Sequence, residues 1–184
     1  MDHQHERDTP PLVAEAVKLA NRMGFAKSCS PETGRLLQVC AAQIQEGVIG
    51  EIGTGSGVGA SWMVSNLRPG GSFITIEIEE HLARAAQRLL ARVTRARVLH
   101  GDWREILSYD PFALLFVDAA PAKQHEPETP LEALRLGGVI VLDDLTPGRQ
   151  RDPLREFWLT DPRVVATEVL VRATEAVILA TRIE

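Results

Sequence analysis

Two glutamates flank a dense cluster of glycines early in the sequence. Four of the 14 glycines fall within residues 53–59, in the string VIGEIGTGSGVGA. Glycines between a strand and a helix let backbone N–H groups come close to a ligand. Glu51 stands before the first of these glycines, within the end of the strand, where a carboxylate suits a cationic group and not a phosphate. The pattern predicts a binding turn for a ligand that carries positive charge.

A second acid, Glu77, lies at the end of the next expected strand, among three isoleucines. A carboxylate in that place can accept hydrogen bonds from both hydroxyls of a ribose. An adenosine ligand with a cationic amino acid tail would fit both glutamates. Two other interpretations stay open. Gly55, Gly57 and Ala60 match the spacing of a dinucleotide-binding loop, and the cluster can also be a tight turn without a ligand.

Three aspartates follow two later strands. Asp118 comes after one of them, and Asp143 and Asp144 come after the next. Ligands of open α/β sheets bind outside the carboxyl ends of the strands, and neighbouring strands lie only about 4.8 Å apart. Three carboxylates gathered there repel one another unless a proton or a cation intervenes. The sequence predicts a site for Mg²⁺ or another divalent cation. The alternative is that Asp118 caps the next segment and Asp144 is solvated.

An alternation of strands and helices must position these acids. Apolar or β-branched runs predict strands at 48–53, 72–78, 96–100, 112–117, 139–142, 164–171 and 176–182. Helical spacing, caps and stops predict helices at 12–23, 30–45, 59–67, 82–93, 102–107, 126–135 and 152–159. Residues 172–175 are too few for a crossover helix, so the last two strands pair antiparallel. The fold class is therefore α/β: a three-layer α/β/α sandwich whose doubly wound, Rossmann-like sheet is mostly parallel and ends in an antiparallel hairpin.

Length and composition are those of one globular domain. The chain has 184 residues, and its net charge of −5 and 5% aromatic content argue against nucleic acid as a partner. We expect residues 1–9 to be disordered and the helices within 10–46 to cap the ligand site. The longest apolar run, 112–117, is too short to span a membrane.

The amino-terminal segment and the cysteines favour the cytoplasm. Residues 1–11 are polar and have no apolar signal-peptide core. Cys29 and Cys40 provide no disulfide framework and are expected to be thiols in a reducing compartment. A small-molecule partner is expected, and a second subunit is one way to complete an open pocket.

The string EIGTGSG from Glu51 to Gly57 and the later Ile76-Glu77-Ile78 resemble motifs I and II of the class I S-adenosylmethionine-dependent methyltransferases. The closing antiparallel hairpin is also similar to that class. Within it, the chain resembles the O-methyltransferases of the catechol and caffeoyl-CoA type, from about Ser30 to the C-terminus. Residues 30–37, SPETGRLL, are similar to the segment of that family that helps to close over the cofactor.

The resemblance implies S-adenosyl-L-methionine as the cofactor. Glu51 and the glycine backbone would face its methionine part, and Glu77 would face its ribose. Asp102 or Trp103 would border the adenine, although Asp102 can equally be an N-cap and Trp103 a core or lid residue. The implied cofactor-binding residues are Glu51, Gly53, Gly55, Gly57, Glu77, Asp102, Trp103 and Asp118.

The resemblance also implies a metal and a base. Asp118 and Asp143 match the metal ligands of the metal-dependent relatives, while Asp144 replaces the usual asparagine. Pro121 stands where relatives carry a catalytic lysine, which leaves Lys123 and His125 as candidate bases. Either can also be an ordinary surface side chain.

Several functions follow from these residues. The first is methyl transfer to a hydroxyl of a small molecule, assisted by a divalent cation. The alternatives are a metal-independent methyltransferase, a nicotinamide-nucleotide oxidoreductase, and a cofactor-binding module without catalysis. A basic stripe of Arg84, Arg88, Arg92 and Arg95 is interpreted as a solvated helix face.

Overall fold

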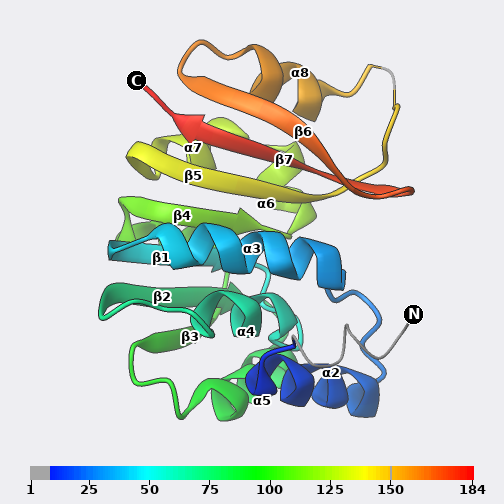
Figure 1. Ribbon diagram of the computed structural model, residues 1–184, viewed down its shortest axis with the longest axis vertical. Helices are drawn as coiled ribbons and strands as arrows, with labels where there is room; N and C mark the ends of the chain where they lie inside the picture. Colours follow the sequence, from blue (N-terminus) through cyan, green and yellow to red (C-terminus); the bar gives the residue numbers. More distant parts are fainter. Residues whose placement is uncertain (1–8, 150) are drawn as a thin grey trace.

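In the computed structural model, which describes residues 9–149 and 151–184, the strands form one sheet in the order β3-β2-β1-β4-β5-β7-β6 (Figure 1). The strands are β1 (Glu46–Ile52), β2 (Gly70–Glu77), β3 (Ala96–His100), β4 (Phe112–Val117), β5 (Leu134–Leu145), β6 (Val164–Arg172) and β7 (Glu175–Arg182). Pairs among β1 to β5 are parallel, whereas β7 runs antiparallel to both β5 and β6. The predicted fold class is confirmed. The expectation for residues 1–9 falls, apart from Thr9, outside the described residues.

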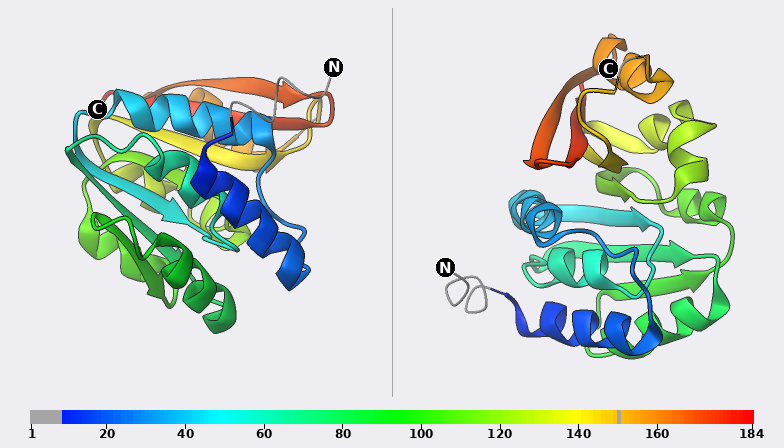
Figure 2. Two further views of the ribbon diagram at one scale, coloured as in Figure 1. Left: turned by 60° about the horizontal axis from the view of Figure 1, so that its bottom comes forward. Right: turned by 90° about the vertical axis from the view of Figure 1, so that its right-hand side faces the viewer.

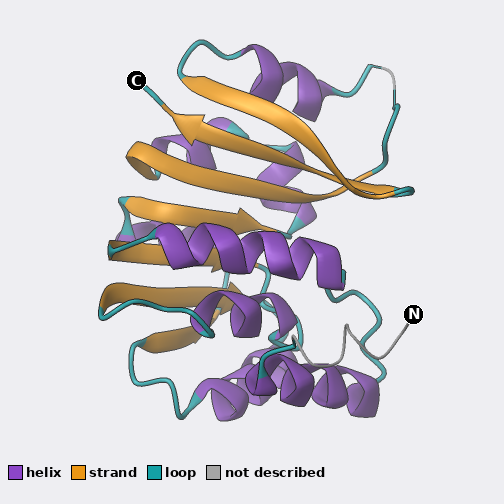
Figure 3. Cartoon of the chain, in the orientation of Figure 1, coloured by secondary structure: helices purple, strands orange, loops and turns teal. Residues whose placement is uncertain are grey.

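Helices cover both faces of the sheet and complete the three layers (Figures 2 and 3). They are α2 (Pro11–Met23), α3 (Pro31–Gln43), α4 (Val58–Val64), α5 (Glu80–Leu90), the 3₁₀ helix η1 (Trp103–Tyr109), α6 (Ala120–Gln124), α7 (Glu128–Glu132) and α8 (Pro153–Thr160). Side chains of α3, α4 and α5 share one apolar core with the sheet. Those of η1, α6, α7 and α8 share a second core on the opposite face.

Helix α3 begins where the sequence predicts. The Ser30 side chain accepts a hydrogen bond from the Thr33 backbone N–H, and Pro31 occupies the first turn, where its missing N–H costs nothing. The same Ser30 hydroxyl and that of Thr33 donate to Oε1 of Glu175, at 2.7 and 2.9 Å. The start of α3 is thereby tied to the start of β7.

The prediction of one helix over 126–135 is wrong. Only the short helix α7 lies within this region, after α6, and β5 begins at Leu134, opposite Phe112 of β4. Gly137 has a φ of 72°, and the register of β4 and β5 shifts between Phe112 and Leu114. The glycine pair that looked like a helix stop therefore lies within a strand. Pairing with the neighbouring strand overrides the local helical pattern.

The basic stripe is not one helix face. Helix α5 ends at Leu90, so Arg92 and Arg95 lie beyond it. Arg92 pairs with Glu15 of α2, and Arg95 donates to the backbone oxygen of Gly71. These arginines join neighbouring segments.

Two further findings concern the cysteines and the possibility of a membrane-spanning helix. Cys29 and Cys40 are free thiols, and burial raises the pKa of Cys29 well above its usual value. Within the described residues, no helix is long and apolar enough to cross a membrane.

The contact of α3 with α4 depends on a residue without a side chain. A Cβ built at Gly34 overlaps the indole ring of Trp62, which is 2% exposed. Overpacking of a core costs about 1–3 kcal/mol. We expect Gly34→Ala to lower the free energy of unfolding by about 2 kcal/mol, measured by urea denaturation. Val39→Ala on the same helix, at a side chain that is 57% exposed, should change it by less than about 0.5 kcal/mol. Equal effects of the two substitutions would contradict this packing.

Candidate active site

A cavity of about 480 Å³ lies at the carboxyl edge of the sheet. We call it the glycine-loop cavity, because Gly53 and Gly55 line it. Its other walls come from residues 25–28, from the ends of β2 and β4, and from Trp103 and Asp144. The parallel strands β1, β2, β4 and β5 all end at this edge, so the loops that follow them meet here.

The glycine loop has a backbone that larger residues would strain. Gly53, Gly55 and Gly57 have φ values of 98°, 53° and 89°. A Cβ at Gly53 would lie 3.2 Å from the backbone nitrogen of Ala119. The N–H groups of Gly53 and Thr54 donate to the oxygen of Ile76, at 3.0 and 3.2 Å. The loop is thus fixed to β2, and its glycines are required by geometry.

Glu77 lies at the wall of the cavity, as its predicted role requires. Its Oε2 accepts from the backbone N–H of Gly55 at 2.7 Å, and its Oε1 accepts from that of Glu79 at 2.9 Å. The residue is 8% exposed. The carboxylate therefore braces the glycine loop while it faces the cavity.

Glu51 lies beneath the loop and outside the residues that line the cavity. Its Oε2 accepts from the Thr75 hydroxyl at 2.6 Å, and its Oε1 packs against Gly59 of α4. Burial raises the pKa of Glu51 to about 8, although the Thr75 hydrogen bond opposes the shift. In this position Glu51 supports the loop, and its contact with a ligand stays a prediction.

The segment between α2 and α3 forms a wall that the sequence did not single out. Phe25, Lys27 and Ser28 line the cavity, and the Ser28 hydroxyl lies 3.3 Å from that of Ser56. A Cβ at Gly55 would lie 2.8 Å from the Phe25 ring. Only the helix stop before this segment and the N-cap after it were visible in the sequence. The capping role of residues 10–46 stays a prediction.

The two residues expected to border the adenine, Trp103 and Asp102, differ in whether they line the cavity. Trp103 lines the cavity and is 7% exposed, and its Nε1 has no partner among the described residues. Asp102 is not a lining residue. Its side chain accepts from the Arg104 backbone N–H and closes a capping box at the start of η1. A cofactor contact of Asp102 remains a prediction.

The three aspartates meet, as their strand ends predict. Oxygen atoms of Asp118, Asp143 and Asp144, which we call the aspartate cluster, all lie within 4.8 Å of one another. Strand β5 continues through this point to Leu145, past the predicted end at 142. Its pairing with β7 shifts register there, and Asp144 has a φ of 62°. The irregularity turns both β5 carboxylates toward Asp118.

The aspartate cluster fits a divalent cation. Burial raises the pKa of Asp118 to about 9 and that of Asp143 to about 6, and the mutual repulsion of the carboxylates adds to both shifts. Asp143 is 2% exposed, and its Oδ1 has no hydrogen-bond partner among the described residues. A buried, unpaired carboxylate oxygen beside two other carboxylates is the environment that hard cations occupy.

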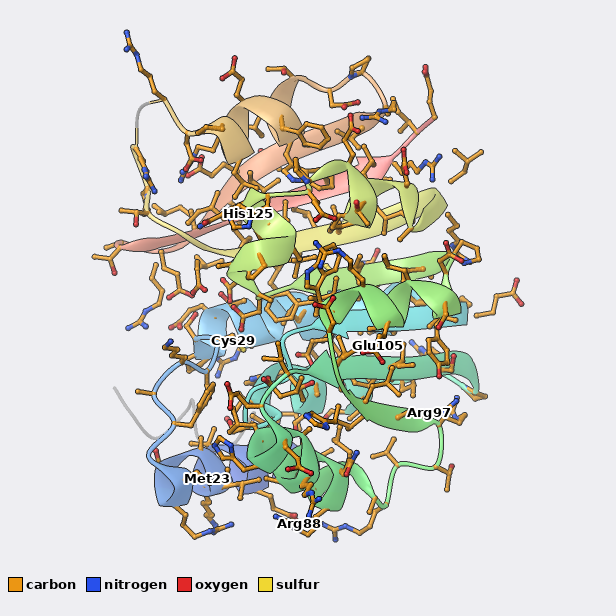
Figure 4. All side chains as sticks on the ribbon, turned by 180° about the vertical axis from the view of Figure 1, so that it is seen from behind. Met23, Cys29, Arg88, Arg97, Glu105 and His125 are labelled. Carbon is orange, nitrogen blue, oxygen red and sulfur yellow. The ribbon has the colours of Figure 1, made fainter. Side chains whose placement is uncertain are left out.

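Both candidate bases line a second cavity of about 470 Å³, between α6 and the start of α8. We call it the α6–α8 cavity. His125 is exposed at the end of α6 (Figure 4). Lys123 is 5% exposed, and its Nζ donates to the backbone oxygen of Asp143 at 2.9 Å and to Oδ2 of Asp144 at 3.3 Å. Asp144 lines both cavities, so they meet at the aspartate cluster.

Comparison with known proteins decides the family. Residues 51–145 match a family model described as a methyltransferase domain, which is more than half of the chain. The chain is also 33% identical over 173 residues to a protein of Mycobacteroides abscessus named "Putative O-methyltransferase", covering 88% of this chain and 77% of that protein. This chain belongs to the methyltransferase family. A relative of the same name from Mycolicibacterium vanbaalenii is 33% identical over 147 residues, and the methyltransferase chain spans 65% of its length.

Solved structures share the fold of this methyltransferase. The O-methyltransferase TomG from Streptomyces achromogenes, in complex with S-adenosylmethionine, has a TM-score of 0.81 and 23% identity, with 96% and 92% of the two chains covered. An O-methyltransferase from Bacillus cereus, in complex with S-adenosylhomocysteine, has a TM-score of 0.80 and 25% identity, with 95% and 91% covered. The resemblance drawn from the sequence is confirmed, and the family assignment replaces the oxidoreductase alternative.

The raised pKa of Glu51 predicts how stability depends on pH. The usual pKa is 4.5 and the folded value is about 8. Between these values only the unfolded chain loses the proton, so the free energy of unfolding falls as pH rises from 5 to 8, by up to ~1.4 kcal/mol per pH unit from this group. Glu51→Gln should flatten this fall in urea denaturation. Glu46→Gln, at the exposed start of the same strand, should leave the slope unchanged. Parallel curves for Glu51→Gln and the unsubstituted protein would rule out the buried, protonated state.

Proposed function

We propose that the chain transfers a methyl group from S-adenosyl-L-methionine to a hydroxyl oxygen of a small molecule. The proposal rests on the junction of the glycine-loop cavity with the α6–α8 cavity at Asp144. Both cavities have the size of small-molecule sites, ~300–1,000 Å³. A methyl donor in one and an acceptor in the other would meet beside the aspartate cluster, and such alignment supplies much of the catalysis of a group transfer.

The glycine-loop cavity offers a partner to each part of the cofactor. Glu77 would accept the ribose hydroxyls, and Trp103 would border the adenine. Burial raises the pKa of Asp118 and Glu51 on this side of the sheet, and a cationic ligand nearby would stabilise their ionised forms. S-adenosylmethionine, when bound, supplies a methyl group activated by its sulfonium. The cofactors of the TomG and Bacillus cereus structures support this assignment.

The aspartate cluster would hold a divalent cation such as Mg²⁺. The unpaired Oδ1 of Asp143 supports this assignment. A bound cation of this kind lowers the pKa of a hydroxyl that it contacts. The metal-independent alternative stays open, because Lys123 already brings one positive charge to Asp144.

The acceptor hydroxyl must lose its proton, and α6 carries both candidate bases. The imidazole of His125 is a side chain of the kind that most often acts as a general base. Two hydrogen bonds of the Lys123 ammonium already go to Asp143 and Asp144, which favours His125 of the two. The basic groups around the α6–α8 cavity include Arg149. A cytoplasmic location and a homodimer remain predictions.

Binding of the product tests the cofactor assignment. We expect Glu77→Ala to weaken the binding of S-adenosylhomocysteine by more than tenfold, about 1.4 kcal/mol, because it removes the carboxylate at the cavity wall. Calorimetry measures this affinity. Glu80→Ala changes an exposed acid that pairs with Arg84 and should keep the affinity within about twofold. An unchanged affinity of Glu77→Ala would remove the ribose assignment, and binding of NAD alone would overturn the proposed cofactor.

Chelation tests the metal. With a panel of catechols and other hydroxylated acceptors, EDTA should abolish the formation of S-adenosylhomocysteine, and added Mg²⁺ should restore it, because a cation at the cluster would activate the hydroxyl. Turnover that persists in EDTA would favour the metal-independent alternative. Cofactor binding without turnover on any acceptor would favour a silent binding module.

A further inference from the structure

Lys123 is a buried cation that reaches the aspartate cluster from α6. The other two lysines of the chain, Lys18 and Lys27, are exposed. A charged group is rarely buried without an opposite charge or strong hydrogen bonds. Lys123 has both, from Oδ2 of Asp144 and from the backbone oxygen of Asp143.

The ammonium contacts the side chain of one acid of the cluster, although its charge also opposes the raised pKa of Asp118 and of Asp143. Its side-chain contact is to Asp144, whereas its contact to Asp143 is to the backbone. Oδ1 of Asp143 has no partner among the described residues. The cluster therefore retains a place for a cation, but one of its carboxylates is already engaged.

We propose that the Lys123 ammonium competes with a divalent cation for Asp144 and so sets the metal affinity of the aspartate cluster. This inference rests on the metal site of the proposed function. Two positive charges that share a carboxylate repel each other, and water screens part of this repulsion because the Asp144 side chain is 72% exposed. The metal would therefore be held mainly by Asp118 and Asp143, with Asp144 reserved for Lys123.

The local sequence explains how the lysine comes to lie there. Pro121 occupies the first turn of α6, where a proline is tolerated, and its side chain cannot provide a charge. Lys123 follows on the same short helix, and its side chain is buried toward β5. The Asp144 carboxylate and the Lys123 ammonium thus form an ion pair between β5 and α6. We treat Lys123 as a positioning residue for the metal, and not as a group that touches the reacting atoms.

Binding of Mn²⁺, followed by the electron paramagnetic resonance of the free ion, tests the competition without reference to activity. Lys123→Met should bind Mn²⁺ at least tenfold more tightly than the unsubstituted protein, about 1.4 kcal/mol. Lys18→Met, which removes an exposed lysine of α2, should leave the affinity unchanged. Equal affinities of the unsubstituted protein and Lys123→Met, or no Mn²⁺ binding by either, would overturn the proposal.

Asp144→Asn tests the same pair from the other side, even if Lys123→Met does not fold. We expect it to weaken Mn²⁺ binding by less than about tenfold, because the metal loses no main ligand and only the repulsion by the unneutralised Lys123 ammonium increases. In this background, adding Lys123→Met should tighten Mn²⁺ binding less than it does in the unsubstituted protein, because there is no Asp144 carboxylate to release. A loss of tenfold or more in Asp144→Asn alone would show that Asp144 serves the metal and would overturn the competition. Calorimetry with S-adenosylhomocysteine on the same proteins reports separately on the proposed function.

Discussion

Parallel strands bring their carboxyl ends to one edge of the sheet, and acidic residues placed there are forced together. Water would solvate these carboxylates in an unfolded chain, whereas the fold removes most of that water from Glu51, Glu77 and Asp143. The hydrogen bonds that replace this water differ from one acid to the next. Glu51 accepts a hydrogen bond from the Thr75 hydroxyl, and Glu77 accepts hydrogen bonds from two backbone N–H groups. Asp144 accepts a hydrogen bond from the Lys123 ammonium. For Oδ1 of Asp143 the described residues provide none. The site lies where the compensation is incomplete.

The same acids also hold the scaffold of the site. Glu77 joins the end of β2 to the glycine loop, and Glu51 joins the end of β1 to α4. Glu175 performs a similar task at a distance, because it binds Ser30 and Thr33 and connects the hairpin to the start of α3. The hairpin that closes the sheet is thereby coupled to the segment that covers the glycine-loop cavity. Carboxylates are thus both the chemical groups of this site and its structural links.

The sequence predicts the features that depend on local pattern. Strand alternation, the N-cap at Ser30, the glycine loop and the convergence of Asp118, Asp143 and Asp144 all follow from periodicity, turn chemistry and the rule for strand ends. The failures have a common physical cause. The extent of β5 depends on its pairing with β4 and β7, and no local window contains that information.

Side-chain direction was equally hidden in the sequence. Lys123 was recognisable as a candidate base, but nothing around it indicated burial against Asp144. Glu51 was expected to face a ligand, and the structure places it beneath the loop against Gly59. The α6–α8 cavity and Arg149 at its border had no sequence signal at all. Such features arise from three-dimensional packing between segments that are distant in the chain.

The wall formed by residues 25–28 has a consequence for how the glycine-loop cavity opens. This segment continues from α2 and leads into α3, and both helices pack against α4, which begins directly after the glycine loop. Phe25 also lies against Gly55 of that loop. The segment is therefore anchored at both ends to the element that carries the loop, unlike a free flap with its own hinges. The wall and the glycine loop therefore share one support, the packing of α2 and α3 against α4.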